Sequence, residues 1–213
     1  RIAKEWNLNL IVARNKDWFG KINPFTASRF ECCSKLKTET LKQVIQEHRF
    51  DAIIVSIRRD EHGIRGKERY MSPRDKDFRW RVYRKRRGSK ESDSGLEALQ
   101  DVELSGWGIY VSDFGPEVNH VRVHPLLHWT EEDVWQYVLK ENLPVNPLYF
   151  SKNGKRYRSL GCMSCTEPFE SNASTVEEIY QEVKSARGME REGRAQDKEE
   201  AYAMERLRTL GYM

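Results

Sequence analysis

The four cysteines of the chain stand in two pairs that could together bind a metal. Cys32 and Cys33 are adjacent, and Cys162 and Cys165 form a CxxC pair much later in the sequence. Without a secretory segment disulfides are a poor expectation, and adjacent cysteines rarely bond to each other. Two pairs suit one four-thiolate site, which would hold structural zinc or an iron–sulfur cluster. The adjacent pair favours the cluster, because there each thiolate binds its own iron; zinc, or thiols that are inert or redox-active, are the alternatives.

Positive side chains follow a predicted buried strand. Residues 52–57 are apolar, and Arg58 and Arg59 come directly after them. Ligands of parallel sheets bind beyond the carboxyl ends of the strands, and guanidinium groups bind phosphate or sulfate oxygens. We therefore predict an anion site with Arg58 and Arg59 as its catalytic and substrate-binding residues. Further substrate contacts are expected from Arg65, Lys67, Arg69 and His124. The alternative is an ion-paired surface loop, because acidic residues are interspersed among these arginines.

The charge of the chain is unevenly distributed. The 213 residues carry a net charge of +4, but residues 58–90 alone hold 14 Lys and Arg against 5 Asp and Glu. Such a basic block indicates an anionic partner. Nucleic acid is a less favoured partner, because no nucleic-acid-binding motif accompanies the charges. No stretch approaches the roughly 20 apolar residues of a membrane span, so we expect a cytoplasmic protein without a membrane partner.

The apolar patterning predicts an α/β fold with a parallel sheet. Short apolar runs predict buried strands at residues 9–13, 52–57 and 121–125. Helical spacing, or Thr followed by acidic residues, predicts helices at residues 38–48, 130–141, 175–187 and 199–209. Strand, helix and strand with short connections make a βαβ unit, whose strands are parallel. Residues 88–115 are rich in Gly, Ser, Asp and Glu and are expected to be an insertion or a flexible loop.

Several stretches resemble one known family. Residues 58–75 (RRDEHGIRGKERYMSPRD), residues 122–135 (RVHPLLHWTEEDVW) and the end of the chain from residue 190 are similar to the small subunit of sulfate adenylyltransferase. The wider group is the PP-loop (adenine nucleotide α-hydrolase-like) superfamily, which includes the phosphoadenylylsulfate and adenylylsulfate reductases. The resemblance implies a three-layer parallel-sheet fold. Residues 1–170 would be a partial, N-terminally truncated PP-loop domain with a flexible insertion at about residues 81–118, and residues 171–213 a C-terminal helical tail.

The cysteines resemble those of the reductase branch. The CC…CxxC pattern is similar to the one that holds a 4Fe–4S cluster in bacterial adenylylsulfate reductases, and Lys37 falls where those enzymes carry a basic residue near the cluster. Two features depart from the family. An SGGKDS-like PP-loop is absent from these 213 residues, and no cysteine follows Cys165. Because the reductases use a C-terminal cysteine as nucleophile, the second departure favours adenylyl transfer over reduction.

The resemblance implies a sulfate-activating adenylyltransferase that converts ATP, with Mg²⁺, and sulfate into adenylylsulfate and pyrophosphate. It also implies a GTPase large subunit as partner, and we expect an oligomer. Three alternatives remain open: an adenylylsulfate or phosphoadenylylsulfate reductase-like enzyme, a non-catalytic binding subunit, and a PP-loop protein that transfers sulfur to nucleic acid.

Overall fold

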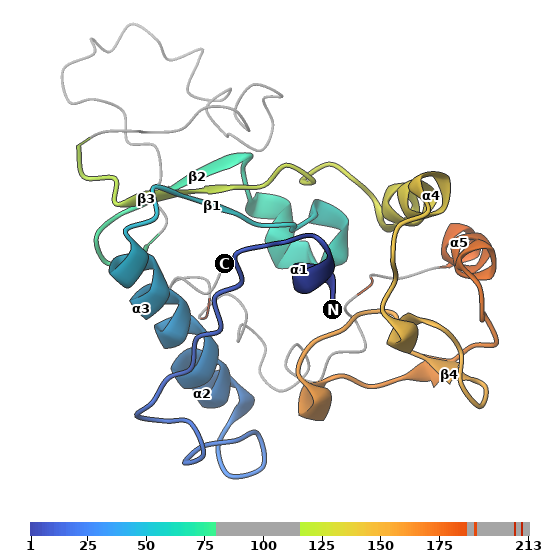
Figure 1. Cartoon of the computed structure of the whole chain (residues 1–213), viewed down its shortest axis with the longest axis horizontal. Coiled ribbons are helices and arrows are strands. Elements are labelled where there is room, and N and C mark those ends of the chain that lie inside the picture. Colours follow the sequence, from blue (N-terminus) through green and yellow to red (C-terminus); the bar gives the residue numbers. More distant parts are fainter. Residues whose placement is uncertain (80–115, 187–189, 191–206, 208–209, 211–213) are drawn as a thin grey trace, which may run out of the picture.

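A computed structural model describes residues 1–79, 116–186, 190, 207 and 210, and every structural statement below concerns these residues (Figure 1). The α-helices are α1 (Ile2–Glu5), α2 (Arg29–Cys33), α3 (Glu39–His48), α4 (Glu131–Glu141) and α5 (Val176–Ser185). The strands are β1 (Ala52–Ile54), β2 (Met71–Arg74), β3 (His120–Val123), β4 (Lys155–Arg156) and β5 (Phe169–Glu170). Single turns of other helix types are η1 (Ser34–Thr38), η2 (Arg59–Glu61), η3 (Gly63–Lys67), η5 (Pro147–Tyr149) and η6 (Met163–Cys165).

The main sheet has three strands in the order β1-β3-β2. β1 and β3 are parallel, which agrees with the predicted parallel sheet, whereas β2 runs antiparallel to β3. The βαβ unit from which that prediction came does not form, because its first strand is missing. The predicted strand at residues 9–13 is wrong: this segment has no strand conformation, and Leu10 and Val12 are 67% and 72% exposed. An apolar run forms a strand only where a neighbouring strand satisfies its backbone groups, and the described residues supply none there.

The three helices predicted from capping and spacing are confirmed within the described residues. α4 begins after Thr130, whose hydroxyl accepts from the Asp133 amide while the Asp133 carboxylate accepts from the Thr130 amide. α5 begins after Thr175 with the same reciprocal bonds to Glu178. These bonds satisfy backbone donors that a helix leaves unpaired at its first turn. α3 ends at Arg49 in the left-handed conformation.

α4 and α5 pack against each other at one end of the molecule, away from α2 and α3 (Figure 1). Their contact is built around Trp135 and Ile179, which are 7% and 0% exposed, with Ala173 and Val183 beside them. Trp135 meets the ring of Tyr149 edge to face at 5.5 Å. This cluster holds the chain that connects β3 to the second cysteine pair, and so it supports the site described below.

The remaining sequence predictions concern parts that the structure leaves out or does not test. The predicted insertion at residues 81–118 and the helix at residues 199–209 fall almost wholly outside the described residues. The domain boundary near residue 170 stays a prediction. In the described part of the chain no helix combines the length and the hydropathy needed to cross a bilayer.

Candidate functional site

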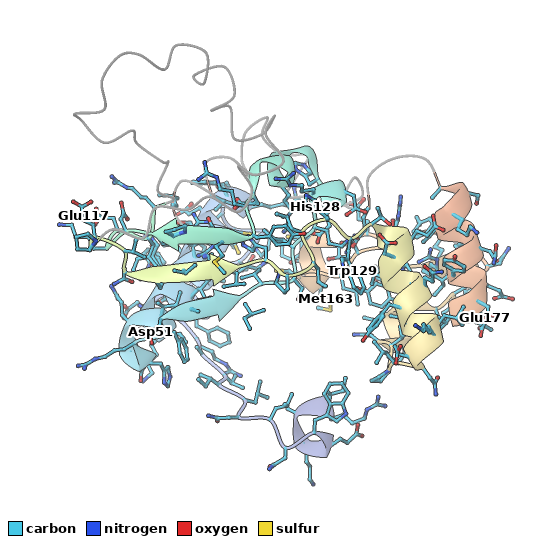
Figure 2. All side chains as sticks on the ribbon, turned by 90° about the horizontal axis from the view of Figure 1, so that it is seen from above. Asp51, Glu117, His128, Trp129, Met163 and Glu177 are labelled. Carbon is cyan, nitrogen blue, oxygen red and sulfur yellow. The ribbon has the colours of Figure 1, made fainter. Side chains whose placement is uncertain are left out.

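The carboxyl end of β1 leads into a loop of paired charges. Figure 2 shows Asp51 and Glu117 at one end of the sheet and His128 at the other, which is the end toward α4. Arg58 lies just beyond β1 and is 7% exposed. Burial lowers the pKa of Arg58, but the carboxylates around it raise it more, so the group stays charged.

Three carboxylates surround the Arg58 guanidinium. Its Nε donates to Asp60 at 3.0 Å, one Nη lies 3.8 Å from Glu61, and the other donates to Glu190. Arg58 therefore has the ion pairs that the sequence analysis weighed as the alternative to an anion site. An incoming anion would have to replace the Glu190 carboxylate at this guanidinium.

Arg59 is placed differently. One Nη donates to the Glu68 carbonyl oxygen at 2.8 Å, while its buried Nε has no hydrogen-bond partner in the structure. The Arg59 amide donates to the Leu127 carbonyl, which ties η2 to the chain after β3. Buried donors are nearly always paired, so the Arg59 Nε is an exception within the described residues, and the binding of an anion by Arg59 stays a prediction.

The other predicted anion residues lie around the same loop. Arg65 pairs with Glu61 and is 7% exposed, and Arg69 is 4% exposed. Lys67 belongs to η3, but its side chain is outside the described part of the structure. The His124 Nδ1 contacts the Arg69 carbonyl oxygen at 2.6 Å, and burial lowers the pKa of His124. The fold thus brings these predicted residues together around the loop that follows β1, and Arg65, Arg69 and His124 are buried there.

The two cysteine pairs come together although they are distant in sequence. Cys32, Cys33 and Cys165 are buried, and Cys162 is half-buried. Burial, with a smaller contribution from the charges of the other three thiols, raises the pKa of Cys33 to about 11. Burial and the charges of Cys162 and Cys165 raise the pKa of Cys32 as well. Among the described residues no three His, Cys, Asp or Glu side chains form a group that could hold one metal ion.

A short π-helix follows the first cysteine pair. η1 begins directly after Cys33, and its Lys35 carbonyl accepts from the Asn15 side chain at 2.8 Å. Such wide turns recur at functional sites, because they displace side chains from the usual helical spacing. Here Lys37 lies close enough to lower the pKa of Cys32 and Cys33, against the effect of burial. A thiolate at either position would be stabilised by this cation.

The second cysteine pair is linked to the arginine loop through the start of α4. Arg158, four residues before Cys162, pairs with Glu131 through bonds of 3.1, 3.1 and 2.6 Å. The Glu131 amide in turn donates to Asp60 at 2.5 Å. Asp60 also accepts from Arg58, so one chain of charged hydrogen bonds runs from the CxxC loop to the strand-end arginines.

Glu131→Gln should destabilise the protein by about 1.5–3 kcal/mol, because it removes charge-assisted bonds from a carboxylate that is 7% exposed. Urea unfolding would measure the loss. The matched control is Glu170→Gln, which removes an ion pair between Lys155 and Glu170 side chains that are 56% and 78% exposed. That control should cost under about 1 kcal/mol. Equal losses for the two variants would contradict the role of Glu131.

A cavity of about 200 Å³ opens between this charged chain and α4. Arg58, Arg158 and Glu131 line one side, and Trp135 and Val145 are among the apolar residues of the other. The cavity therefore places apolar surface beside two guanidinium groups, each of which already has a carboxylate partner.

Sequence reasoning missed three groups that the structure brings into this region. They are Glu131, Arg158 and Glu190, none of which the sequence analysis names as a site residue. It also made no use of His120, although the alternation of His120, Arg122 and His124 along one stretch of chain places all three on the same side. That alternation was the available signal.

With the geometry described, comparison with known proteins defines the class. The phosphoadenosine phosphosulfate reductase domain matches residues 1–168, and the chain belongs to this family. Its relatives include proteins named sulfate adenylyltransferase subunit 2. The one from Aeromonas salmonicida is 35% identical over 99% of this chain and 72% of its own length. Those from Chromobacterium violaceum and Sulfurimonas denitrificans are 36% and 34% identical, each over 99% of this chain and 73% of its own length.

Proposed function

We propose that this chain is the adenylyl-transferring subunit of a sulfate adenylyltransferase and that it carries a 4Fe–4S cluster. The proposed adenylyl transfer rests on the similarity, over 99% of the chain, to relatives named sulfate adenylyltransferase subunit 2. Family membership also implies the adenine nucleotide α-hydrolase-like fold, and the parallel pair of β1 and β3 is consistent with it.

The proposed reaction joins ATP and sulfate. A sulfate oxygen attacks the α-phosphorus, the bond from that phosphorus to the bridging oxygen breaks, and pyrophosphate leaves with the electron pair. No protein nucleophile is needed, so catalysis depends on positioning and on neutralising charge, with Mg²⁺ on the phosphates. Arg59 would hold an oxyanion through its unpaired Nε, and Arg58 would join it once Glu190 is displaced. Lys67 remains a predicted further contact.

We propose a cluster rather than a single zinc ion for the cysteine group, because adjacent cysteines can bind different irons of one cluster. A zinc–sulfur distance of about 2.3 Å in a tetrahedron brings the sulfurs to about 3.8 Å from one another. The four thiols are near enough for Cys162 and Cys165 to raise the pKa values of Cys32 and Cys33. A four-iron cluster spaces its thiolates more widely, because each binds a different iron. Cys32, Cys33, Cys162 and Cys165 would hold it, and it would supply a centre of fixed charge beside Lys37.

The partner belongs to the same proposal. The name "subunit 2" of the relatives supports a second, large subunit, which we propose to be a GTPase. The basic residues 58–90 suit an anionic substrate such as a nucleotide with sulfate.

The decisive experiment mixes the protein and its large subunit with ATP, Mg²⁺ and sulfate and measures pyrophosphate. Sulfate-dependent pyrophosphate release supports adenylyl transfer. Release of sulfite from adenylylsulfate with thioredoxin or glutathione, and no pyrophosphate from ATP, would instead support the reductase-like alternative. The reductase is the second candidate because the CC…CxxC cysteines are the ones that resemble that branch.

Arg59→Met should raise the sulfate concentration needed for half-maximal pyrophosphate release by tenfold or more, because a charged hydrogen bond is worth about 1.5–3 kcal/mol. Initial rates over a series of sulfate concentrations would measure the change. Lys152→Met removes one positive charge from an exposed residue near β4 and should leave the curve unchanged. A normal sulfate requirement in Arg59→Met would remove Arg59 from the site.

A further inference from the structure

A groove of about 460 Å³ lies on the surface of α4. It is lined by Trp129, Asp133, Gln136, Tyr137 and Lys140; Trp129 is half-buried and the other four residues are exposed. We call it the α4 groove. It shares no residue with the cavity described above, and Figure 2 labels Trp129 where the chain from the sheet enters α4. Ligand pockets commonly measure about 300–1,000 Å³, so the groove has room for a bound group.

Two aromatic rings meet in the α4 groove. The ring centroids of Trp129 and Tyr137 lie 5.3 Å apart, and the ring planes make an angle of 75°. In this edge-to-face arrangement each ring keeps at least one face that the other ring does not cover. Such faces are negative and attract cations, most often the guanidinium group of arginine. Tyr137 is 45% exposed, so its ring is accessible to a partner.

Asp133 is the carboxylate of the first turn of α4 that has no ion pair among the described residues. The other two acidic side chains of this turn have cationic partners. Glu131 pairs with Arg158, and Glu132 lies 4.0 Å from Lys184. The negative charge that this turn leaves uncompensated therefore lies in the α4 groove.

The Asp133 carboxylate uses only one of its oxygens within the described residues. Its Oδ2 accepts from the Thr130 amide at 2.7 Å and from the Thr130 hydroxyl at 2.8 Å, whereas its Oδ1 accepts from no described residue. The bonds from Thr130 lower the pKa of Asp133, so the carboxylate is charged at neutral pH. They also fix the side chain in place, which leaves the Oδ1 as an acceptor for a group in the groove.

Lys140 gives the α4 groove a direction. It follows Asp133 by seven residues, which corresponds to about 10 Å along a helix axis. The groove is therefore negative at the end near Asp133 and positive at the end near Lys140. A bound cation is attracted to the first end and repelled from the second.

We propose that the α4 groove is a docking surface for the second subunit and receives an arginine side chain from it. The guanidinium group stacks on an aromatic face and donates to the Asp133 Oδ1. Arginine fits better than lysine, because its planar group both stacks on rings and donates from several N–H groups. Tryptophan, tyrosine and arginine are also the side chains that dominate the binding energy of many protein interfaces. This inference rests on the partner named in the proposed function, but it does not depend on the reaction.

The test titrates the full chain with its large subunit by calorimetry, without ATP or sulfate. Asp133→Asn keeps an oxygen for the bonds from Thr130 and removes the charge, so it should weaken the complex by about tenfold or more. The matched control is Glu178→Gln, because Glu178 accepts from the Thr175 amide at the start of α5 and does not line the groove. It should bind like the parent. The melting temperatures of both variants show whether each one is folded.

Two further residues test the nature of the bound group. Tyr137→Leu should weaken the complex by about threefold or more, whereas Tyr137→Phe keeps a ring face and should bind like the parent. Lys140→Gln removes a repelling charge and should tighten the complex. Equal affinity of parent and Asp133→Asn, or weaker binding by Lys140→Gln, would overturn the docking surface alone.

The outcomes also separate this proposal from the proposed function. Absence of any complex between the two chains would overturn the docking surface together with the proposed partner. A complex that is weakened by Asp133→Asn but releases no pyrophosphate from ATP and sulfate would contradict adenylyl transfer and support the docking surface.

Discussion

Cys33→Ser is expected to abolish iron binding by this protein. The parent, purified without oxygen, should hold about four irons per chain and absorb as an iron–sulfur protein. Cys33 is 3% exposed, so its side chain cannot be replaced as a ligand by another group from solvent. A hydroxyl is a poor ligand for iron–sulfur iron, so one iron of the cluster would lose its ligand and we expect the cluster not to assemble. Iron and sulfide analysis of both proteins measures the effect.

Met163→Ala is the matched control for the cysteine variant. Met163 lies inside the CxxC loop but is 96% exposed, so its loss should leave the iron content unchanged. Figure 2 labels Met163 in this loop, at the carboxyl end of the sheet. One zinc per chain in the parent, with no iron, would refute the cluster.

Trp135→Ala is expected to destabilise the fold by about 3–5 kcal/mol. The indole is 7% exposed and lies in the cluster between α4 and α5, in edge-to-face contact with Tyr149. Removing it enlarges the cavity that Trp135 lines together with Arg58 and Arg158. The free energy of unfolding in urea measures the loss.

Gln136→Ala, the next residue of the same helix, tests whether the loss belongs to the core or to the helix. Gln136 is exposed, and alanine favours a helix at least as well, so its stability should change by less than about 0.5 kcal/mol. A Trp135→Ala loss below about 1 kcal/mol would mean that the contact between α4 and α5 does not anchor this end of the protein.

Local features of the chain could be read correctly because their causes are local. Thr130 and Thr175 cap α4 and α5 through bonds to residues three positions later, so the sequence alone predicted where each of these helices begins. The apolar spacing of residues 38–48 predicted α3 for the same reason. The apolar run at residues 9–13 led to a wrong prediction of a strand. A strand needs a neighbouring strand to pair with its backbone, and the local pattern of residues does not show whether one is present.

The sequence by itself determined which residue types could do chemistry: two cysteine pairs, and arginines directly after a strand. Only the tertiary structure decided their partners. Arg58 meets Glu190 across 132 residues of chain, and Arg158 meets Glu131 across 27. Which side of the sheet is buried was also beyond local pattern, because alternation along β3 separates two sides without saying which one faces the interior. The physical reason is that burial and charge pairing depend on which distant segments of the chain come into contact, and the local sequence does not show these contacts.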